Sequence, residues 1–240
     1  MNITRIIIPA LLLACPLLGM AQSTPAIAPS FTYTDSEGNE QTVTSANDQA
    51  PLAATFHANA TDAEGWTAHY EWHFYLEGQR SNPYLVRYET DTQYTFTKAG
   101  MHLVELWATF VQGNDTIAYA DAYWQNEGTP LSIAIAESKL EMPNAFSPNG
   151  DGINDVYKAK SGYKSIVEFH ATIFNRWGQK LYSWDDPARG WDGKFHGKDV
   201  AQGVYYVLVK AKGADGRNYQ IKRDVNLLRG YTETTSNSNE

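Results

Sequence analysis

The strongest constraint on this chain is the spacing of its apolar residues, which alternate with polar ones over short segments. The clearest segment is 70–76, where one face of an extended strand would collect Tyr70, Trp72, Phe74 and Leu76. Such segments recur about every 8 to 12 residues with Gly, Asn or Asp between them, and no long run follows a helical period. The sequence therefore predicts an all-β protein built from sandwich-type sheets.

Composition narrows the classes of partner and site. The 240 residues carry a formal net charge of −8, so the chain lacks the excess of cations with which nucleic-acid binders neutralise phosphate. Its single cysteine, Cys15, allows no intrachain disulfide and no cysteine-based zinc site. We expect no nucleic-acid partner.

Residues 1–21 have the pattern of a secretory signal peptide. A short basic start with Arg5 precedes an apolar run over 6–18, and small residues lead to a cleavage position after Ala21. The segment 12–15 also fits a lipobox that would lipidate Cys15, and this alternative stays open. Residues 22–30 are expected to be a linker, and no later stretch approaches the ~20 apolar residues of a membrane span.

Residues 31–135 are expected to form the first sandwich, with strands at 70–76, 84–88, 93–96, 103–111 and 116–124. His69 and His73 lie about 13 Å apart on one extended strand, so they suit a solvated face better than one metal ion. The segments 72–74 and 94–106 resemble the core strands of PKD-type domains, which are immunoglobulin-like sandwiches of extracellular proteins. That resemblance implies a spacer or recognition module.

The second half contains a longer ordered series of motifs, in the segments 142–157, 173–182, 190–194, 203–209 and 225–229. Together they resemble the gliding-motility-associated C-terminal domain of Bacteroidetes, the type B sorting domain of the type IX secretion system. The resemblance covers residues 140–230 and leaves a polar tail at 231–240. Its motif residues are Pro143, Asn144, Phe146, Pro148, Asn149, Gly150, Asp151, Gly152, Asn154, Asp155, Asn175, Arg176, Trp177, Gly178, Trp191, Asp192, Gly193, Gly203 and Tyr205.

The same residues have an interpretation independent of the family. The segments 175–178 and 190–193 have the composition of tight turns, and turn or core roles account for Trp177, Trp191 and the neighbouring glycines. Strand 203–209 has apolar residues on both faces, which predicts a central strand of a sandwich of about seven strands. The hairpin after it turns at 215–216.

The loop 149–155 is the one candidate for an ion. Asn149, Asp151, Asn154 and Asp155 offer oxygen ligands around glycines, as calcium loops do. Ser147 and Lys158 stand where an EF-hand has its first and last carboxylates, so the loop is no EF-hand and is at most a weak calcium candidate. The favoured interpretation is a loop of Asx turns whose side chains bind local amides. No other cofactor is expected.

The chain has none of the common catalytic motifs, and Asp185, Asp186 and Asp192 cluster in one turn-rich loop. We expect a non-enzymatic protein, exported across the inner membrane and then by the type IX machinery to the outer-membrane surface or the medium. The resemblance implies a PorP/SprF-type outer-membrane partner and adhesion through an unknown surface ligand or glycan.

The alternative is a carbohydrate-binding module or an accessory subunit of a surface degradative complex. It needs a coplanar exposed row of aromatic residues, for which Trp66 and Trp124 are candidates together with Tyr75, Tyr84 or Tyr88. In a sandwich these aromatic residues are more often part of the core.

Overall fold

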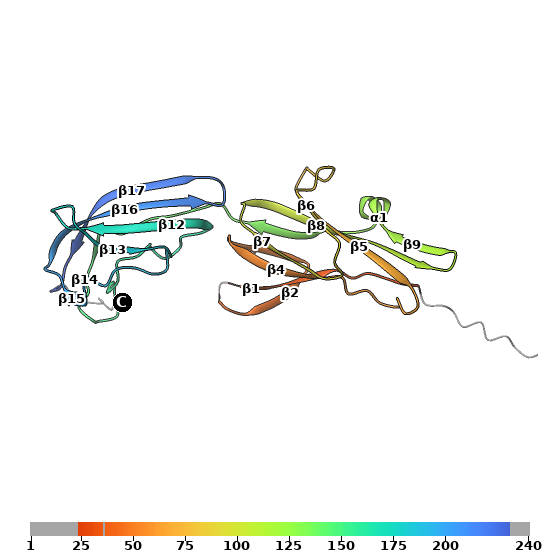
Figure 1. The fold of residues 1–240 in the computed structure, drawn as a ribbon, viewed down its shortest axis with the longest axis horizontal. Helices are drawn as coiled ribbons and strands as arrows, with labels where there is room; N and C mark the ends of the chain where they lie inside the picture. Colours follow the sequence, from red (N-terminus) through yellow and green to blue (C-terminus); the bar gives the residue numbers. More distant parts are fainter. Residues whose placement is uncertain (1–23, 36, 231–240) are drawn as a thin grey trace, which may run out of the picture.

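The computed structural model describes residues 24–35 and 37–230, and it consists almost entirely of strands. Two immunoglobulin-like β-sandwiches follow one another end to end (Figure 1). This arrangement confirms the predicted all-β class. The predicted signal peptide, Cys15 and the polar tail lie outside the described residues. Within the predicted linker, Ala26 pairs with Thr61, and the first strand already begins at Ser30.

The first sandwich has two sheets that together contain ten strands. One sheet has the order β2 (Glu40–Val43), β1 (Ser30–Thr34), β4 (Leu52–His57) and β7 (Thr92–Phe96). The other has the order β3 (Ser45–Asp48), β10 (Leu131–Ile135), β8 (Gly100–Gln112), β5 (Thr67–Leu76) and β6 (Leu85–Arg87). Strand β9 (Asp115–Tyr119) pairs with the end of β8. Only the β3–β10 pair in this sandwich is parallel.

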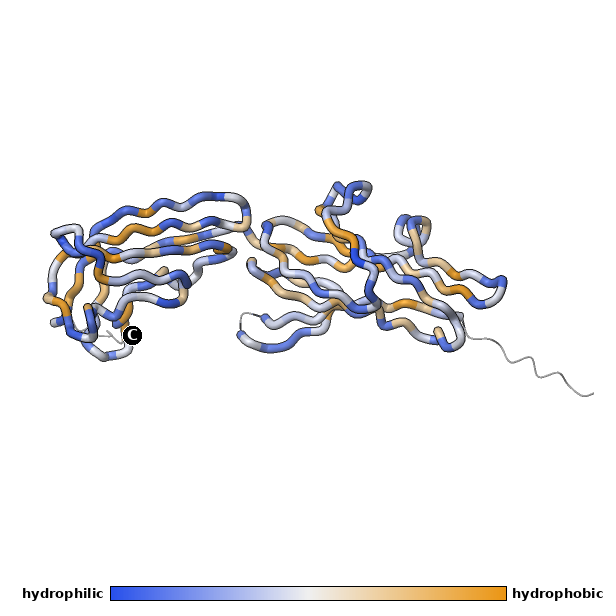
Figure 2. Tube along the Cα trace, in the orientation of Figure 1, coloured by the Kyte–Doolittle hydropathy of each residue, from blue (hydrophilic) through white to orange (hydrophobic). Residues whose placement is uncertain are grey.

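The core of the first sandwich follows the predicted alternation along β5. Trp72 and Phe74 are fully buried and pack on Phe56 of the opposite sheet, with ring centroids 5.7 and 5.1 Å away. The Trp72 indole N–H donates to the backbone oxygen of Glu89 at 3.1 Å, so the polar atom of this large side chain is satisfied. Apolar residues are interspersed with hydrophilic ones along the strands (Figure 2).

The strand predicted over 116–124 is wrong in its second half. Strand β9 ends at Tyr119, and helix α1 (Asp121–Asn126) follows. The helical turn brings Trp124 inward, where it is 6% exposed and its indole N–H donates to the Leu106 oxygen at 3.1 Å. A strand would instead alternate Tyr123 and Trp124 between faces, whereas the helix packs both against the core. No helix among residues 24–35 and 37–230 is long and apolar enough to cross a membrane.

The second sandwich is built on one five-stranded sheet. Its order is β11 (Ala145–Phe146), β17 (Asn218–Leu227), β16 (Gly203–Gly213), β12 (Ile166–Phe174) and β13 (Lys180–Trp184). The hairpin β14 (Lys194–Phe195) and β15 (Lys198–Asp199) forms a second small sheet, which brings the total to the predicted seven strands. Strand β16 is central, as predicted, and its residues Tyr205, Val207 and Val209 face the core.

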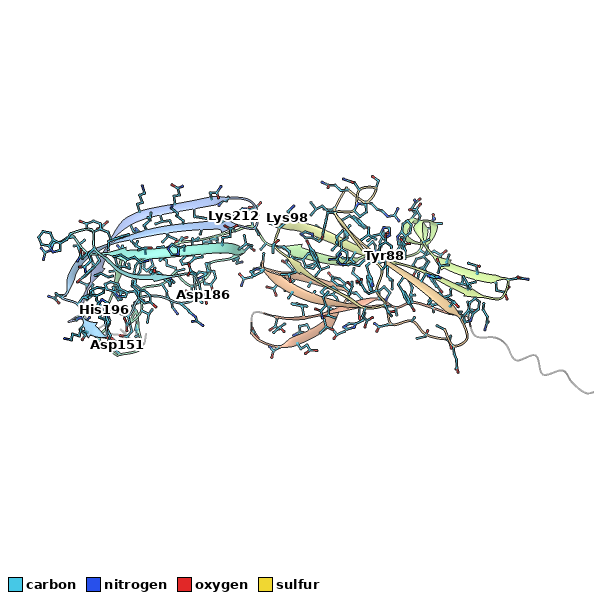
Figure 3. All side chains as sticks on the ribbon, in the orientation of Figure 1. Tyr88, Lys98, Asp151, Asp186, His196 and Lys212 are labelled. Atoms are coloured by element: carbon cyan, nitrogen blue, oxygen red, sulfur yellow. The ribbon has the colours of Figure 1, made fainter. Side chains whose placement is uncertain are left out.

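The two sandwiches meet through the ends of their strands. The Ala99 amide donates to the Ala214 oxygen at 3.0 Å, and the Ala50 amide donates to the Ser165 hydroxyl at 3.1 Å. Ala214 itself packs in the core of the first sandwich. Lys98 and Lys212 mark the two sides of this junction (Figure 3).

Candidate functional site

The predicted motif residues divide into a buried set and an exposed set. The buried members are Phe146, Trp191, Gly193 and Tyr205, and the half-buried ones are Pro143, Pro148, Asp155 and Asn175. The exposed members are Asn144, Asn149, Gly150, Asp151, Gly152, Asn154, Arg176, Trp177, Gly178, Asp192 and Gly203. The buried set builds the fold, so any surface role falls to the exposed set.

The buried motif residues form one aromatic cluster around Trp191. Phe146 and Tyr205 lie 5.4 and 5.1 Å from the Trp191 ring, and the Trp191 indole N–H donates to the Lys194 oxygen at 2.8 Å. Gly193 has φ +76° and lies against Pro148 and Leu227, where an added Cβ would come within 3.0 Å of the proline. A core role therefore accounts for Trp191, and a turn under close packing accounts for Gly193.

Arg229 joins the motif segments, although the sequence did not single it out as a site residue. Its guanidinium donates to the backbone oxygens of Val200 at 3.0 Å, Pro148 at 3.3 Å and Gly193 at 2.7 Å. One side chain thus ties three loops together through their backbone carbonyls, and the Gly193 oxygen also accepts the Val200 amide at 3.1 Å. The only sequence indication is an arginine just after the last apolar strand, at the end of the 225–229 motif.

The turn at 175–178 is confirmed, and of the turn and core roles expected for its residues Trp177 has the turn role. The Asn175 side-chain oxygen accepts the amides of Trp177 and Gln179, both at 3.0 Å, and Gly178 has φ +78°. This Asx turn directs Trp177 outward, where it is 81% exposed and its ring lies 5.4 Å from the Arg176 guanidinium carbon. Its side chain is thus not needed to fill the core.

The loop 149–155 is a set of Asx turns. The Asp155 carboxylate accepts the amides of Gly150 at 2.7 Å and Gly152 at 2.8 Å, and these bonds lower the pKa of Asp155. The Asp151 carboxylate accepts the Ile153 amide and the Asn149 side-chain N–H. In the described part of the chain, no three His, Cys, Asp or Glu side chains are grouped to hold a metal ion. These Asx turns are the favoured alternative to a calcium site.

A polar groove on the outward face of β5 and β8 was not anticipated from the sequence. It has a volume of about 640 Å³ and lies between these strands, the 78–83 loop and α1. Its floor holds Glu105, whose side chain is only 2% exposed. The Glu105 carboxylate accepts from the Tyr75 hydroxyl at 2.7 Å, from Arg80 Nε at 2.6 Å and from the Trp107 indole at 2.9 Å.

The wall of the groove is held by the same arginine. Arg80 also donates to Asp121 of α1 at 2.7 Å, and Gln125 donates to the other oxygen of that carboxylate at 2.6 Å. His73 stacks on Trp107 with centroids 4.4 Å apart and planes 12° apart, so it is not the solvated side chain expected. The polar groups of the groove are therefore fixed before any ligand arrives.

The row of exposed aromatics that a carbohydrate-binding module would need is not formed. Trp124 is 6% exposed and Tyr75 is 2% exposed, so neither can stack on a ligand. Tyr84 and Tyr88 are exposed, at 41% and 70%, but Tyr84 bonds to His102 and packs against Phe74 and Tyr94. The groove, rather than an aromatic row, is the candidate ligand site of the first sandwich.

Comparison with protein families decides the nature of the second sandwich. Residues 140–223 match the family described as the CHU_C type IX secretion signal domain. This part of the chain is a type IX secretion signal domain. The match agrees with the order of the motifs and with the buried cluster around Trp191. A comparison with curated proteins finds no match.

Solved structures resemble the chain only loosely. The FN1–FN3 domains of chicken CNTN1 match with 10% identity and a TM-score of 0.29, covering 77% of this chain and 62% of that one. Dimeric latent PorU from Porphyromonas gingivalis matches with 11% identity and a TM-score of 0.28, covering 87% of this chain and 20% of that one. This chain thus spans less than two thirds of either protein, and TM-scores this low carry no functional argument.

Charge differs sharply between the signal domain and the sandwich before it. Residues 140–230 carry 14 Lys and Arg against 10 Asp and Glu, whereas residues 31–135 carry 3 against 14. The negative charge of the chain is therefore concentrated in the first sandwich. The first sandwich therefore has a negative electrostatic field and the signal domain a positive one.

The Glu105 network predicts an acid-sensitive first sandwich. Burial opposes ionisation of Glu105, but hydrogen bonds from Arg80, Trp107 and Tyr75 outweigh it and lower its pKa below the usual 4.5. A carboxyl group whose pKa is lower in the folded than in the unfolded protein stabilises the fold at pH values above its unfolded pKa. This contribution is lost as the pH falls through the folded pKa. Glu105→Gln should therefore cost about 3 kcal/mol near neutral pH, since it leaves Arg80 without its buried partner.

Chemical unfolding of the wild type and of Glu105→Gln across pH 3 to 7, monitored by tryptophan fluorescence, measures this cost. The difference between wild type and Glu105→Gln should be constant above about pH 5 and shrink below pH 4.5. Glu77→Gln, which removes an exposed carboxylate on the same loop, is the control for a lost surface charge. A difference that does not depend on pH would contradict an ionised Glu105.

The loop 149–155 yields a second prediction. Because Asp151 and Asp155 already bind local amides, we expect the same melting temperature in millimolar calcium and in chelator. Differential scanning calorimetry of the full chain checks this. A melting temperature that rises with calcium and returns to its first value in Asp155→Asn would instead establish the ion site.

Proposed function

We propose that this chain is a non-enzymatic protein that crosses the inner membrane, is exported by the type IX secretion system, and acts at the outer-membrane surface or in the medium. The observation that carries the proposal is the type IX secretion signal domain at residues 140–223. A signal domain at the C-terminal side makes the first sandwich the exported cargo. A PorP/SprF-type outer-membrane protein is the proposed partner at the surface.

The first sandwich is the proposed interaction module, of the PKD-like kind, and adhesion is its proposed role. The groove supports this role, because its polar groups are preorganised and converge on one space of about 640 Å³. The first sandwich as a whole is strongly acidic, so its electrostatic field attracts basic ligands and repels anionic ones.

Protease shaving of intact cells tests the export proposal. The full chain should be cleaved at the cell surface, while a chain ending at Leu140 should stay in the periplasm, because it lacks the signal domain. Fractionation and immunoblotting separate the two locations. If the truncated chain reaches the surface as well, residues 140–230 are not an export signal in this protein.

Carbohydrate binding is the second candidate, through polar contacts in the groove instead of an aromatic row, and the charge pattern of the groove favours it. An anion would meet the carboxylate of Asp121, which is 54% exposed, and a cation would meet the Arg80 guanidinium. A neutral saccharide has hydroxyls that both donate and accept, so it can satisfy both groups together. The Ser81 hydroxyl and the Gln125 amide add further polar atoms to the lining.

Calorimetric titration with cellotetraose, xylotetraose and mannotetraose tests this candidate. At least one tetrasaccharide should bind the full chain, and Gln125→Ala should weaken that binding about tenfold by removing one buried hydrogen bond to the ligand. Tyr88→Ala, an exposed change outside the groove, should have no effect. Binding that survives Gln125→Ala unchanged, or no binding at all, would contradict the candidate.

A further inference from the structure

The outward face of the signal domain carries an apolar surface that the fold does not need. We define the distal patch as Phe174, Val204, Tyr206 and Leu208, which line one groove, together with Trp177 on the turn that follows Phe174. Phe174 pairs directly with Tyr206 across β12 and β16, and both strands place their polar residues farther along. Trp177 is 81%, Tyr206 48% and Val204 47% exposed.

The core of the signal domain does not need these apolar side chains. On β16 the inward residues Tyr205, Val207 and Val209 already fill the core, so the alternate positions Val204 and Tyr206 could be polar at no cost to packing. The face is also hollowed, with a groove of about 640 Å³ lined by Phe174, Val204, Tyr206 and Leu208 among others. Exposed aromatic and aliphatic side chains gathered around a groove mark a protein contact.

The position of the patch suits an export signal. Along the β12–β16 pair, Phe174 and Tyr206 lie at one end, and Ile166 and Gly213 lie at the other. Ala214, next to Gly213, contacts the first sandwich, so the patch is at the end of the signal domain away from the cargo (Figure 1). A partner can therefore reach it whatever domain precedes the signal.

Charge indicates the chemistry of that partner. Arg176 stacks on Trp177, Lys180 pairs with Phe174 in the β12–β13 register, and Lys222 pairs with Leu208 in the β16–β17 register. Asp224, opposite Tyr206, is the one acidic residue at this end of the β16–β17 register. A basic rim around an apolar centre complements an acidic rim around an apolar centre.

We propose that the distal patch is the surface by which the type IX machinery binds this signal domain, through a protein with an acidic, apolar face. The proposal rests on the proposed export function and adds to it the residues that make the contact. Trp177, 81% exposed on the turn after Phe174, is the proposed anchor, because an exposed tryptophan beside an arginine gains a large contact area on docking. The buried cluster around Trp191 acts only by holding the patch in shape.

Surface export of the full chain in a bacterium with a type IX secretion system tests the patch. The variants are Trp177→Ala, Tyr206→Ser and the double change, with Tyr88→Ala as the matched exposed aromatic outside the signal domain. The double change should lower the surface fraction about tenfold or more, with the protein held in the periplasm. Its melting temperature should stay within about 2 °C of wild type, since exposed side chains contribute little to stability.

The chain ending at Leu140 separates this proposal from the export function on which it rests. If that truncation is retained in the periplasm and the double variant is exported like wild type, the signal function stands and the distal patch is wrong. If the truncated chain is itself exported, the export function fails. A double variant that changes only the oligomeric state of the purified protein would make the patch a contact between copies, which also overturns the proposal.

Discussion

The two-residue period of the central strand β16 is the constraint on which the signal domain depends. Because β16 is bonded to β12 on one side and β17 on the other, its residues have only two directions available. The inward set, Tyr205, Val207 and Val209, closes the core around Trp191. The outward set then becomes surface by necessity, and a slip of one residue would exchange the two sets completely.

The same principle explains how the first sandwich places a carboxylate beneath a groove. On β8 the inward residues Val104 and Leu106 are fully buried, and Glu105 between them must face outward. It is nonetheless buried there, because α1 and the loop carrying Arg80 cover that part of the sheet. An ionised group in this position is tolerated only because Tyr75, Arg80 and Trp107 all donate to it.

The sequence predicts local pattern well and tertiary context less well. The class, the central strand, and the turns at 175–178 and 215–216 follow from alternation and from the residue types that turns require. Helix α1 does not follow, because six residues are too few to show a helical period and tertiary packing of Trp124 decides their conformation.

Three side chains illustrate the limit at the candidate sites. Trp177 is of a residue type that is usually buried, and it is exposed only because the Asx turn directs its side chain outward. From the sequence, Arg229 would be expected to be an ordinary surface cation. Its three carbonyl partners come from loops about 30 to 80 residues away in the chain. Glu105 reads as an outward strand residue, and its burial depends on elements that no local pattern relates to it.

We infer that the second sandwich alone directs export, and a fusion protein tests this claim. Residues 140–230 are joined to a signal peptide and a monomeric fluorescent protein that is otherwise retained in the periplasm, and surface exposure is measured by protease shaving of intact cells. We expect the fusion to reach the surface, and to stay in the periplasm when the secretion system is inactivated. A fusion that remains periplasmic in cells with an active system, although it is folded and fluorescent, would contradict the claim.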